Sequence, residues 1–126
     1  MGSKEEIASI ARALGIPSVD GILKRYLGYN ILLKGDPKLS SRIYRGCQID
    51  IGEDEGPTLY VVQQNKPDDH LAEQIANLYP TVGKQDFKKA TFGQLGLEGM
   101  VFQPGVIRLG DRVRISEPEN SGFNPY

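Results

Sequence analysis

The sequence is poor in the residues that form disulfides and zinc sites, with one cysteine, Cys47, and one histidine, His70. A lone cysteine cannot form an intrachain disulfide, and it is typical of proteins in a reducing compartment. No Cys-x-x-Cys or His-Glu-x-x-His spacing is present, which excludes the common zinc motifs. The sequence therefore predicts a cytoplasmic protein with no metal site made only of its own side chains.

An excess of one charge and long hydrophobic runs are also absent. The chain has 15 lysines and arginines against 16 acidic residues, which gives no electrostatic basis for binding nucleic acid or a membrane surface. Apolar runs such as Ile31–Leu33 are far too short to span a bilayer. The first residues, Met1–Glu6, contain no apolar stretch, so we expect no signal peptide.

The residues that are present are those of a globular protein. A chain of 126 residues with 39% hydrophobic and 25% charged residues is long enough to bury an ordinary core. We expect one domain over residues 1–116. The last residues, 117–126, are rich in proline, asparagine and glycine, which predicts a loose C-terminal tail.

Residues that recur at helical spacing predict two amphipathic helices and a shorter third one. Ser3 and Glu6 fit a capping box, in which each side chain binds a free amide at the helix start. The first helix follows this box and stops at Gly15. We expect the second helix over residues 71–78 and the shorter one over residues 85–90.

The remaining pattern is that of an antiparallel β protein. The run Thr58–Val62 is rich in β-branched and aromatic residues, as in a buried strand. Val113 and Ile115 alternate with Arg112 and Arg114, which predicts a half-buried strand with a basic outer face. Further strands are expected at residues 31–33, 41–44, 47–51, 97–102 and 106–109. The sequence therefore predicts an α+β fold that is mainly β, with two or three helices.

The segment Asn65–His70 holds the histidine, two adjacent carboxylates and a lysine. It lies between a strand and a helix, where folds often present reactive groups. One interpretation makes Asp68 an oxygen ligand or a general base near His70. The other is structural: Asn65 is the N-cap, Asp68 lies at the third helical position, and His70 is a surface residue of the first turn. Two residues apart on a helix, Asp68 and His70 would diverge by about 200 degrees, which favours the structural interpretation.

Cysteine and lysine side chains supply two further candidates. Cys47 lies in a predicted strand, where a small buried side chain is favoured over a nucleophile because no neighbouring base is visible. Lys84, Lys88 and Lys89, together with Arg25, form either an anion-binding rim for a phosphorylated cofactor or a solvated helix face.

Three blocks of sequence share a pattern with a known family. Arg25–Gly35 contains Leu27-Gly28-Tyr29-Asn30, Val62–Asp68 contains Asn65-Lys66-Pro67-Asp68, and Phe92–Ile115 contains a Gly110-Asp111 turn. In this order the blocks resemble the MOSC domain, named for the C-terminal domain of molybdenum cofactor sulfurase. That family typically has Leu-Gly-Glu-Asn, then Asn-x-Pro-Cys after a strand, and a closing hairpin that contains Gly-Asp.

The resemblance covers residues 3–116 and implies a β-barrel, complete or incomplete, decorated with helices. It also implies molybdenum cofactor or sulfur transfer, since relatives include amidoxime and hydroxylaminopurine reductases. Candidates for binding such a cofactor, or another small anionic ligand, are Asn30, Asn65, Lys66, Asp68, Lys88 and Lys89.

Three departures from the family pattern affect the expected function. The family's reactive cysteine falls on Asp68, and a carboxylate is a hard donor that cannot carry a persulfide. The family's glutamate falls on Tyr29. The family's initial strands have no counterpart before the first helix, and a barrel without them has open strand edges that must be paired, covered or blunted.

We therefore expect a degenerate, non-catalytic MOSC-like domain that acts as a binding or assembly module and holds no cofactor. It would form a homodimer through exposed strand edges. The alternative is an enzyme domain, a molybdenum-cofactor-linked reductase or sulfurtransferase, with its pocket at Asn65–His70 and Asp68 in place of the cysteine.

Overall fold

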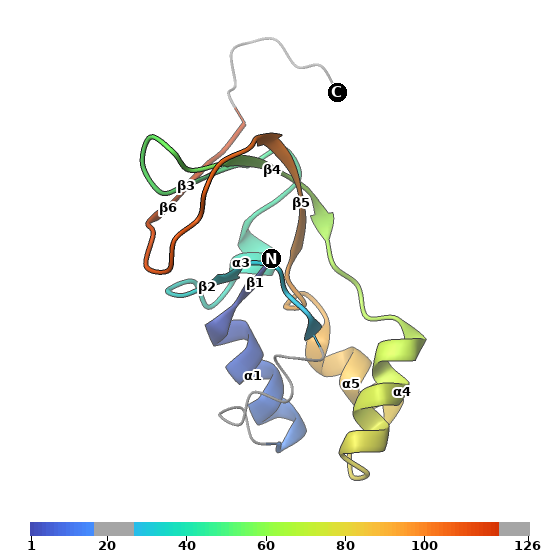
Figure 1. The fold of residues 1–126 in the computed structure, drawn as a ribbon. Helices are drawn as coiled ribbons and strands as arrows, with labels where there is room; N and C mark the ends of the chain where they lie inside the picture. The colour runs from blue at the N-terminus through green and yellow to red at the C-terminus, as the bar shows by residue number, and fades with distance from the viewer. Residues whose placement is uncertain (17–26, 119–126) are drawn as a thin grey trace. The chain divides into compact units, whose positions relative to one another are not determined.

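The computed structural model describes residues 1–16 and 27–118, which form an α+β fold (Figure 1). Its elements are β1 (Gly2–Ser3), α1 (Lys4–Leu14), β2 (Leu32–Leu33), α3 (Leu39–Arg42), β3 (Gln48–Ile51), β4 (Thr58–Gln64), α4 (Asp69–Leu78), α5 (Lys84–Thr91), β5 (Leu97–Gln103) and β6 (Val113–Ser116). The chain divides into two compact units, Met1–Arg42 with Gln64–Glu98 and Ile43–Gln63 with Gly99–Tyr126. No helix in the described ranges combines the length and the apolar character that a membrane crossing requires.

Local signals set the ends of α1 in the first unit. The Ser3 hydroxyl accepts a hydrogen bond from the backbone N–H of Glu6 at 3.3 Å, as expected of an N-cap. At the other end Gly15 adopts a left-handed backbone conformation with φ of 67°, which lets its N–H bind the last carbonyls of the helix. The predicted first helix is therefore confirmed.

The core of the first unit is built from the apolar faces of α1, α4 and α5. The helices α4 and α5 pack side by side, and α1 packs on α5 (Figure 1). Phe87 of α5, Ile10 of α1 and Ile75 of α4 are fully buried in one cluster. The predicted helices over residues 71–78 and 85–90 are both confirmed, each with slightly wider bounds. Beside them β1 and β2 pair in parallel.

The four-stranded sheet has the order β5-β4-β3-β6, with β3 antiparallel to both β4 and β6. Ile49 of β3 lies opposite Leu59 of β4 and Ile115 of β6, and this row faces the buried side. Gln48 lies opposite Tyr60 and Ser116 on the other face, which is more exposed. Residues of period two thus separate into a buried apolar face and a more exposed face that carries polar and apolar side chains.

The strand predicted at residues 41–44 is wrong, because residues 39–42 form the short helix α3. Asp36 starts this turn by accepting a hydrogen bond from the N–H of Lys38 at 3.0 Å, and its carboxylate also forms an ion pair with Arg42. The carbonyl of Lys38 then accepts the N–H of Arg42 at 2.9 Å. An Asp-Pro sequence followed by such bonds favours a turn over a strand. The described residues consequently contain four helices rather than two or three.

The predicted strand at residues 106–109 is also wrong. The Asp111 carboxylate accepts the N–H of Arg108 at 2.7 Å, and the N–H of Asp111 binds the carbonyl of Arg108 at 3.0 Å. These bonds close a tight turn and take backbone groups that a strand would use. The chain then enters β6, which is confirmed. Of the predicted tail, residues 119–126 lie outside the described residues.

Candidate functional site

Asp68 is the N-cap of α4 in the turn that the sequence singles out. Its carboxylate accepts a hydrogen bond from the N–H of Leu71 at 2.7 Å, and its backbone is extended, with φ of −100° and ψ of 165°. The expected capping role is confirmed, but its position is corrected, because Asp68 rather than Asn65 is the N-cap. The reason is Pro67, which disfavours helical backbone at Lys66, the residue that would open the helix if Asn65 were the N-cap.

Replacing Asp68 with alanine is expected to lower the free energy of unfolding by about 1 kcal/mol, because the Leu71 N–H loses its acceptor. Urea denaturation measures this difference. Asp68→Asn retains a capping oxygen and should stay close to the native value. His70→Ala changes an exposed side chain in the first turn of the same helix and is the matched control. An equal loss in the Asp68→Ala and His70→Ala proteins would contradict the capping role.

Asn65 has a different role from the one expected. Its side-chain amide donates to the carbonyl of Leu95 at 3.3 Å, and its backbone N–H donates to the carbonyl of Gly96 at 2.9 Å. The Tyr29 hydroxyl donates to the same Leu95 carbonyl at 2.8 Å. Tyr29 and Asn65 come from different blocks of the MOSC resemblance, so the structure does bring these blocks together. What they form is a hydrogen-bonded junction.

Tight packing against two glycines holds the Tyr29 ring in this junction. A Cβ atom at Gly2 would lie 2.4 Å from the ring, and one at Gly96 would lie 2.7 Å from it. Burial raises the pKa of the Tyr29 hydroxyl well above its ordinary value, and the charge of Glu6 raises it further. The phenol therefore stays neutral and acts as a hydrogen-bond donor.

The other polar residues of the turn point to solvent. His70 and Lys66 are exposed, and His70 lies in the first turn of α4, as the structural interpretation predicted. Asn30 is exposed as well. Among residues 1–16 and 27–118 there is no group of three or more His, Cys, Asp or Glu side chains that could hold a metal ion.

The lysines of α5 are distributed over different surroundings. Lys88 forms an ion pair with Asp69, and Lys84 forms one with Glu73 at 3.1 Å. The hydrogen bond and the charge of Lys88 lower the pKa of the Asp69 carboxyl. Two lysines of the proposed rim are thus paired with carboxylates of α4, whereas Arg25 lies outside the described residues. Anion binding by this rim stays a prediction.

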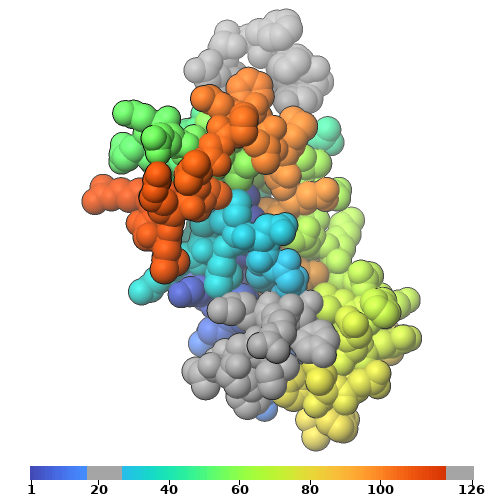
Figure 2. Space-filling model, viewed as in Figure 1, coloured from blue at the N-terminus to red at the C-terminus, as the bar shows by residue number. Residues whose placement is uncertain are grey.

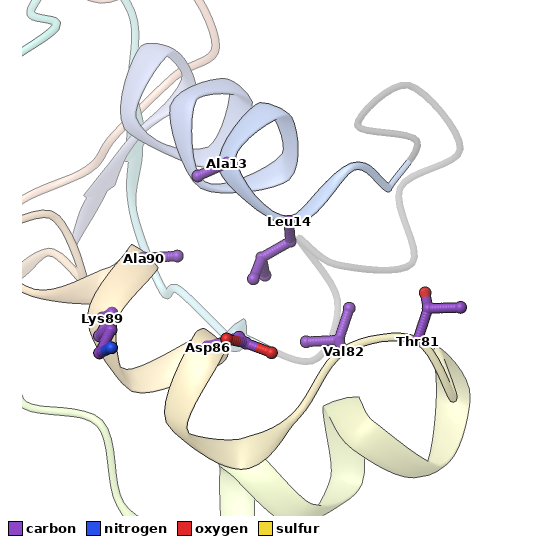
Figure 3. Close-up of a pocket in the computed structure, with 7 residues that line it drawn as sticks. All are labelled: Ala13, Leu14, Thr81, Val82, Asp86, Lys89 and Ala90. Carbon is purple, nitrogen blue, oxygen red and sulfur yellow. The ribbon is translucent and has the colours of Figure 1, made fainter.

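Lys89 lines a pocket between α1 and α5 with a volume of about 380 Å³. Figure 3 shows Leu14 of α1 and Val82 pointing into it, with Asp86 between Val82 and Lys89 along the wall. The Asp86 carboxylate accepts the N–H of Gly83 at 3.2 Å and so caps its own helix. The lining is therefore mainly small and apolar, with one cation at its margin.

Glu6 forms a buried polar cluster that sequence reasoning missed. Its side chain is 1% exposed, and its carboxylate accepts the Ser40 hydroxyl at 2.8 Å and the Ser40 N–H at 3.2 Å. The Ser40 hydroxyl in turn accepts the N–H of Gly96 at 2.7 Å. The expectation that Glu6 completes a capping box is wrong, because Ser40 takes its carboxylate. Desolvation by burial raises the pKa of the Glu6 carboxyl despite these hydrogen bonds.

Cys47 is 1% exposed and directly precedes β3 in the second unit. The expectation of a small buried side chain is confirmed. Because its thiol is enclosed by the core and lies in the other unit from Asp68, nothing in the described structure makes it a replacement for the family cysteine.

The edge strand β5 presents the most apolar exposed surface of the second unit. Met100, Val101 and Phe102 are 56%, 59% and 65% exposed. Three further apolar side chains of the following segment are exposed, Val106, Ile107 and Leu109. Figure 2 shows this part of the chain, in orange, at the surface. We call Met100–Phe102 the edge surface.

A groove lies on the more exposed face of the sheet next to the edge surface, with a volume of about 940 Å³. Phe102 packs edge-to-face on Tyr60, with ring centroids 5.2 Å apart, and the Tyr60 hydroxyl donates to Gln48 at 3.1 Å. Side chains of both kinds line the groove, among them Arg45, Gln48, Tyr60, Val62, Met100 and Phe102. The groove therefore has an apolar wall from Met100 and Phe102 of β5, and Gln48 of β3 is one of its polar lining residues.

Comparison with known proteins gives a likeness in structure. No protein-family model and no curated protein matches this sequence. The fold is similar to that in the crystal structure of the YUAD protein from Bacillus subtilis, with a TM-score of 0.79 and 27% sequence identity. The match covers 94% of this chain and 63% of that chain, so this chain spans less than two thirds of the other's length.

Proposed function

We propose that this chain is a divergent MOSC-like domain that acts as an assembly module and forms a homodimer through the edge of β5. Its open four-stranded sheet would correspond to an incomplete barrel of that family. The observation that carries the proposal is the edge surface, since three consecutive large apolar side chains are more than half exposed on an edge strand. Exposed apolar surface of this kind marks interaction sites.

The chemistry of the Asn65–His70 turn supports a module without catalysis. Molybdenum–sulfur chemistry needs a soft thiolate, and the turn offers the Asp68 carboxylate instead. That carboxylate is already used to cap α4, and Asn65 is used in the junction with Tyr29. The residues present therefore do not fit a molybdenum cofactor held through sulfur.

Sedimentation equilibrium over a series of protein concentrations tests the assembly. We expect a dimer at high concentration and at least tenfold weaker association of the Val101→Lys protein, because the substitution places a charge in the middle of the edge surface. Phe92→Lys is the matched control, since Phe92 is 84% exposed but lies outside the edge surface. It should associate like the native protein.

Two results would contradict the proposal. A protein that stays monomeric at every concentration would exclude a homodimer. Purified protein that carries stoichiometric molybdenum, lost in Asp68→Ala, would instead favour the enzyme domain with its pocket at Asn65–His70.

A further inference from the structure

The hydrogen bonds of Leu97 show which backbone groups of β5 face outwards. Its N–H and carbonyl both bind Met1, each at 2.8 Å, whereas the carbonyl of the preceding Gly96 binds Asn65, just after β4. Backbone groups of alternate residues in a strand point to opposite edges. Gly99, Val101 and Gln103 therefore present their N–H and carbonyl groups to the side of β5 that faces away from β4. No strand of the described chain pairs there beyond Met1.

The segment Gly99–Gln103 carries no charge and no proline. Strand edges that avoid pairing usually carry lysine, proline or a bulge, so this one lacks the usual protection. Its limits are defined on both sides, because Met1 occupies the edge at Leu97 and Pro104 has no N–H to donate. Five residues are thus available for pairing, and Val101 is the middle one.

We infer that two copies of this chain pair their β5 strands antiparallel around a two-fold axis at Val101. Val101 then lies opposite Val101 of the second copy, and Gly99 lies opposite Gln103 of the second copy. Both pairs use outward-facing backbone groups, which makes them hydrogen-bonded pairs. This inference rests on the homodimer proposed above and adds the direction and register of the pairing.

Side chains on the groove face favour this register. Met100 of one copy lies opposite Phe102 of the other, and thioether–aromatic contacts are favourable. Because Phe102 already packs on Tyr60, the partner's Met100 extends that row across the interface. Glu98 falls outside the paired segment. A parallel, in-register arrangement would instead bring the two Glu98 side chains toward each other, which is unfavourable.

Single cysteine substitutions distinguish these arrangements. Opposite residues of a hydrogen-bonded pair have Cα atoms about 5.5 Å apart, within the range that a disulfide spans. Val101→Cys should therefore form a cross-linked dimer on mild oxidation. Gln103→Cys is the matched control, because the two Gln103 residues would lie four residues out of register, about 14 Å apart. The native Cys47 is buried and should not react.

The outcomes separate the register from the assembly. Cross-linking of Val101→Cys alone, at concentrations where the native protein is a dimer, is the expected result. Cross-linking of both variants would overturn the antiparallel direction in favour of a parallel pair. Cross-linking of neither, with a dimeric native mass, would overturn the register while leaving the homodimer in place. A monomeric native protein would overturn the inference together with the proposed function.

Discussion

Replacing Gly96 with alanine is expected to lower the free energy of unfolding by about 3 kcal/mol or more. Gly96 has a φ of 92°, a region that L side chains rarely adopt, and an added Cβ would lie 2.4 Å from the carbonyl oxygen of Met1. That oxygen is bound to the N–H of Leu97, so it cannot move away without losing the bond. The same Cβ would lie 2.7 Å from the Tyr29 ring. That ring is held by the hydrogen bond from its hydroxyl to the Leu95 carbonyl and by its packing against Gly2.

Gly93→Ala is the matched control for this prediction. Gly93 also has a positive φ, of 71°, but an added Cβ would meet nothing within 4 Å. The free energy of unfolding of Gly93→Ala should fall only by the cost of the left-handed conformation, about 1 kcal/mol. Chemical denaturation of the three proteins measures both values. Equal losses at Gly96 and Gly93 would show that the packing around Tyr29 is not as tight as described.

Removal of the Glu6 carboxylate is expected to have an effect of similar size. Glu6→Ala leaves the N–H and the hydroxyl of Ser40 buried without their acceptor, at a cost of about 3 kcal/mol in total. Lys4→Ala, in the same helix turn but exposed, should change the free energy of unfolding little. A near-neutral result for Glu6→Ala in chemical denaturation would contradict the role of this cluster.

The pH dependence of Glu6 has a defined sign. Its pKa is raised in the folded state above the ordinary value of 4.5, so the folded protein holds this proton after the unfolded chain has lost it. Its contribution to the free energy of unfolding is fully present below the ordinary value and is lost as the pH rises through the raised pKa. Glu6→Gln cannot titrate, so the difference in stability between native and Glu6→Gln protein should shift in favour of Glu6→Gln across that window.

The helices that the sequence predicts best are those whose signals are local. Ser3 caps α1 and Gly15 ends it, as the sequence predicts, whereas the N-cap of α4 was expected at Asn65 and lies at Asp68. The short helix α3 was missed because residues 41–44 are a mixture of polar and apolar residues of strand length. The hydrogen bond from the Lys38 N–H to the Asp36 side chain instead makes a turn before them. The Asp36-Pro37 sequence was the local signal that favoured this turn.

In the candidate site, too, features set by local signals could be predicted and features set by distant contacts could not. The segment Asn65–His70 was the right place to look for a structured turn, and the capping role of Asp68 could be predicted from the residue type. The partner of Asn65 could not, because Leu95 is 30 residues away in the sequence. The edge surface was expected only as open strand edges in general, and the residues that form it were not identified.

The sequence by itself determined the α+β class, both ends of α1 and the absence of a thiol from the Asn65–His70 turn. These depend on residue type and on neighbours within one helical turn. Only the tertiary structure decided that Glu6 binds Ser40, that Tyr29 and Asn65 share one carbonyl, and that β5 is an exposed edge. Those features depend on contacts between residues far apart in the chain, which periodicity and capping patterns do not encode.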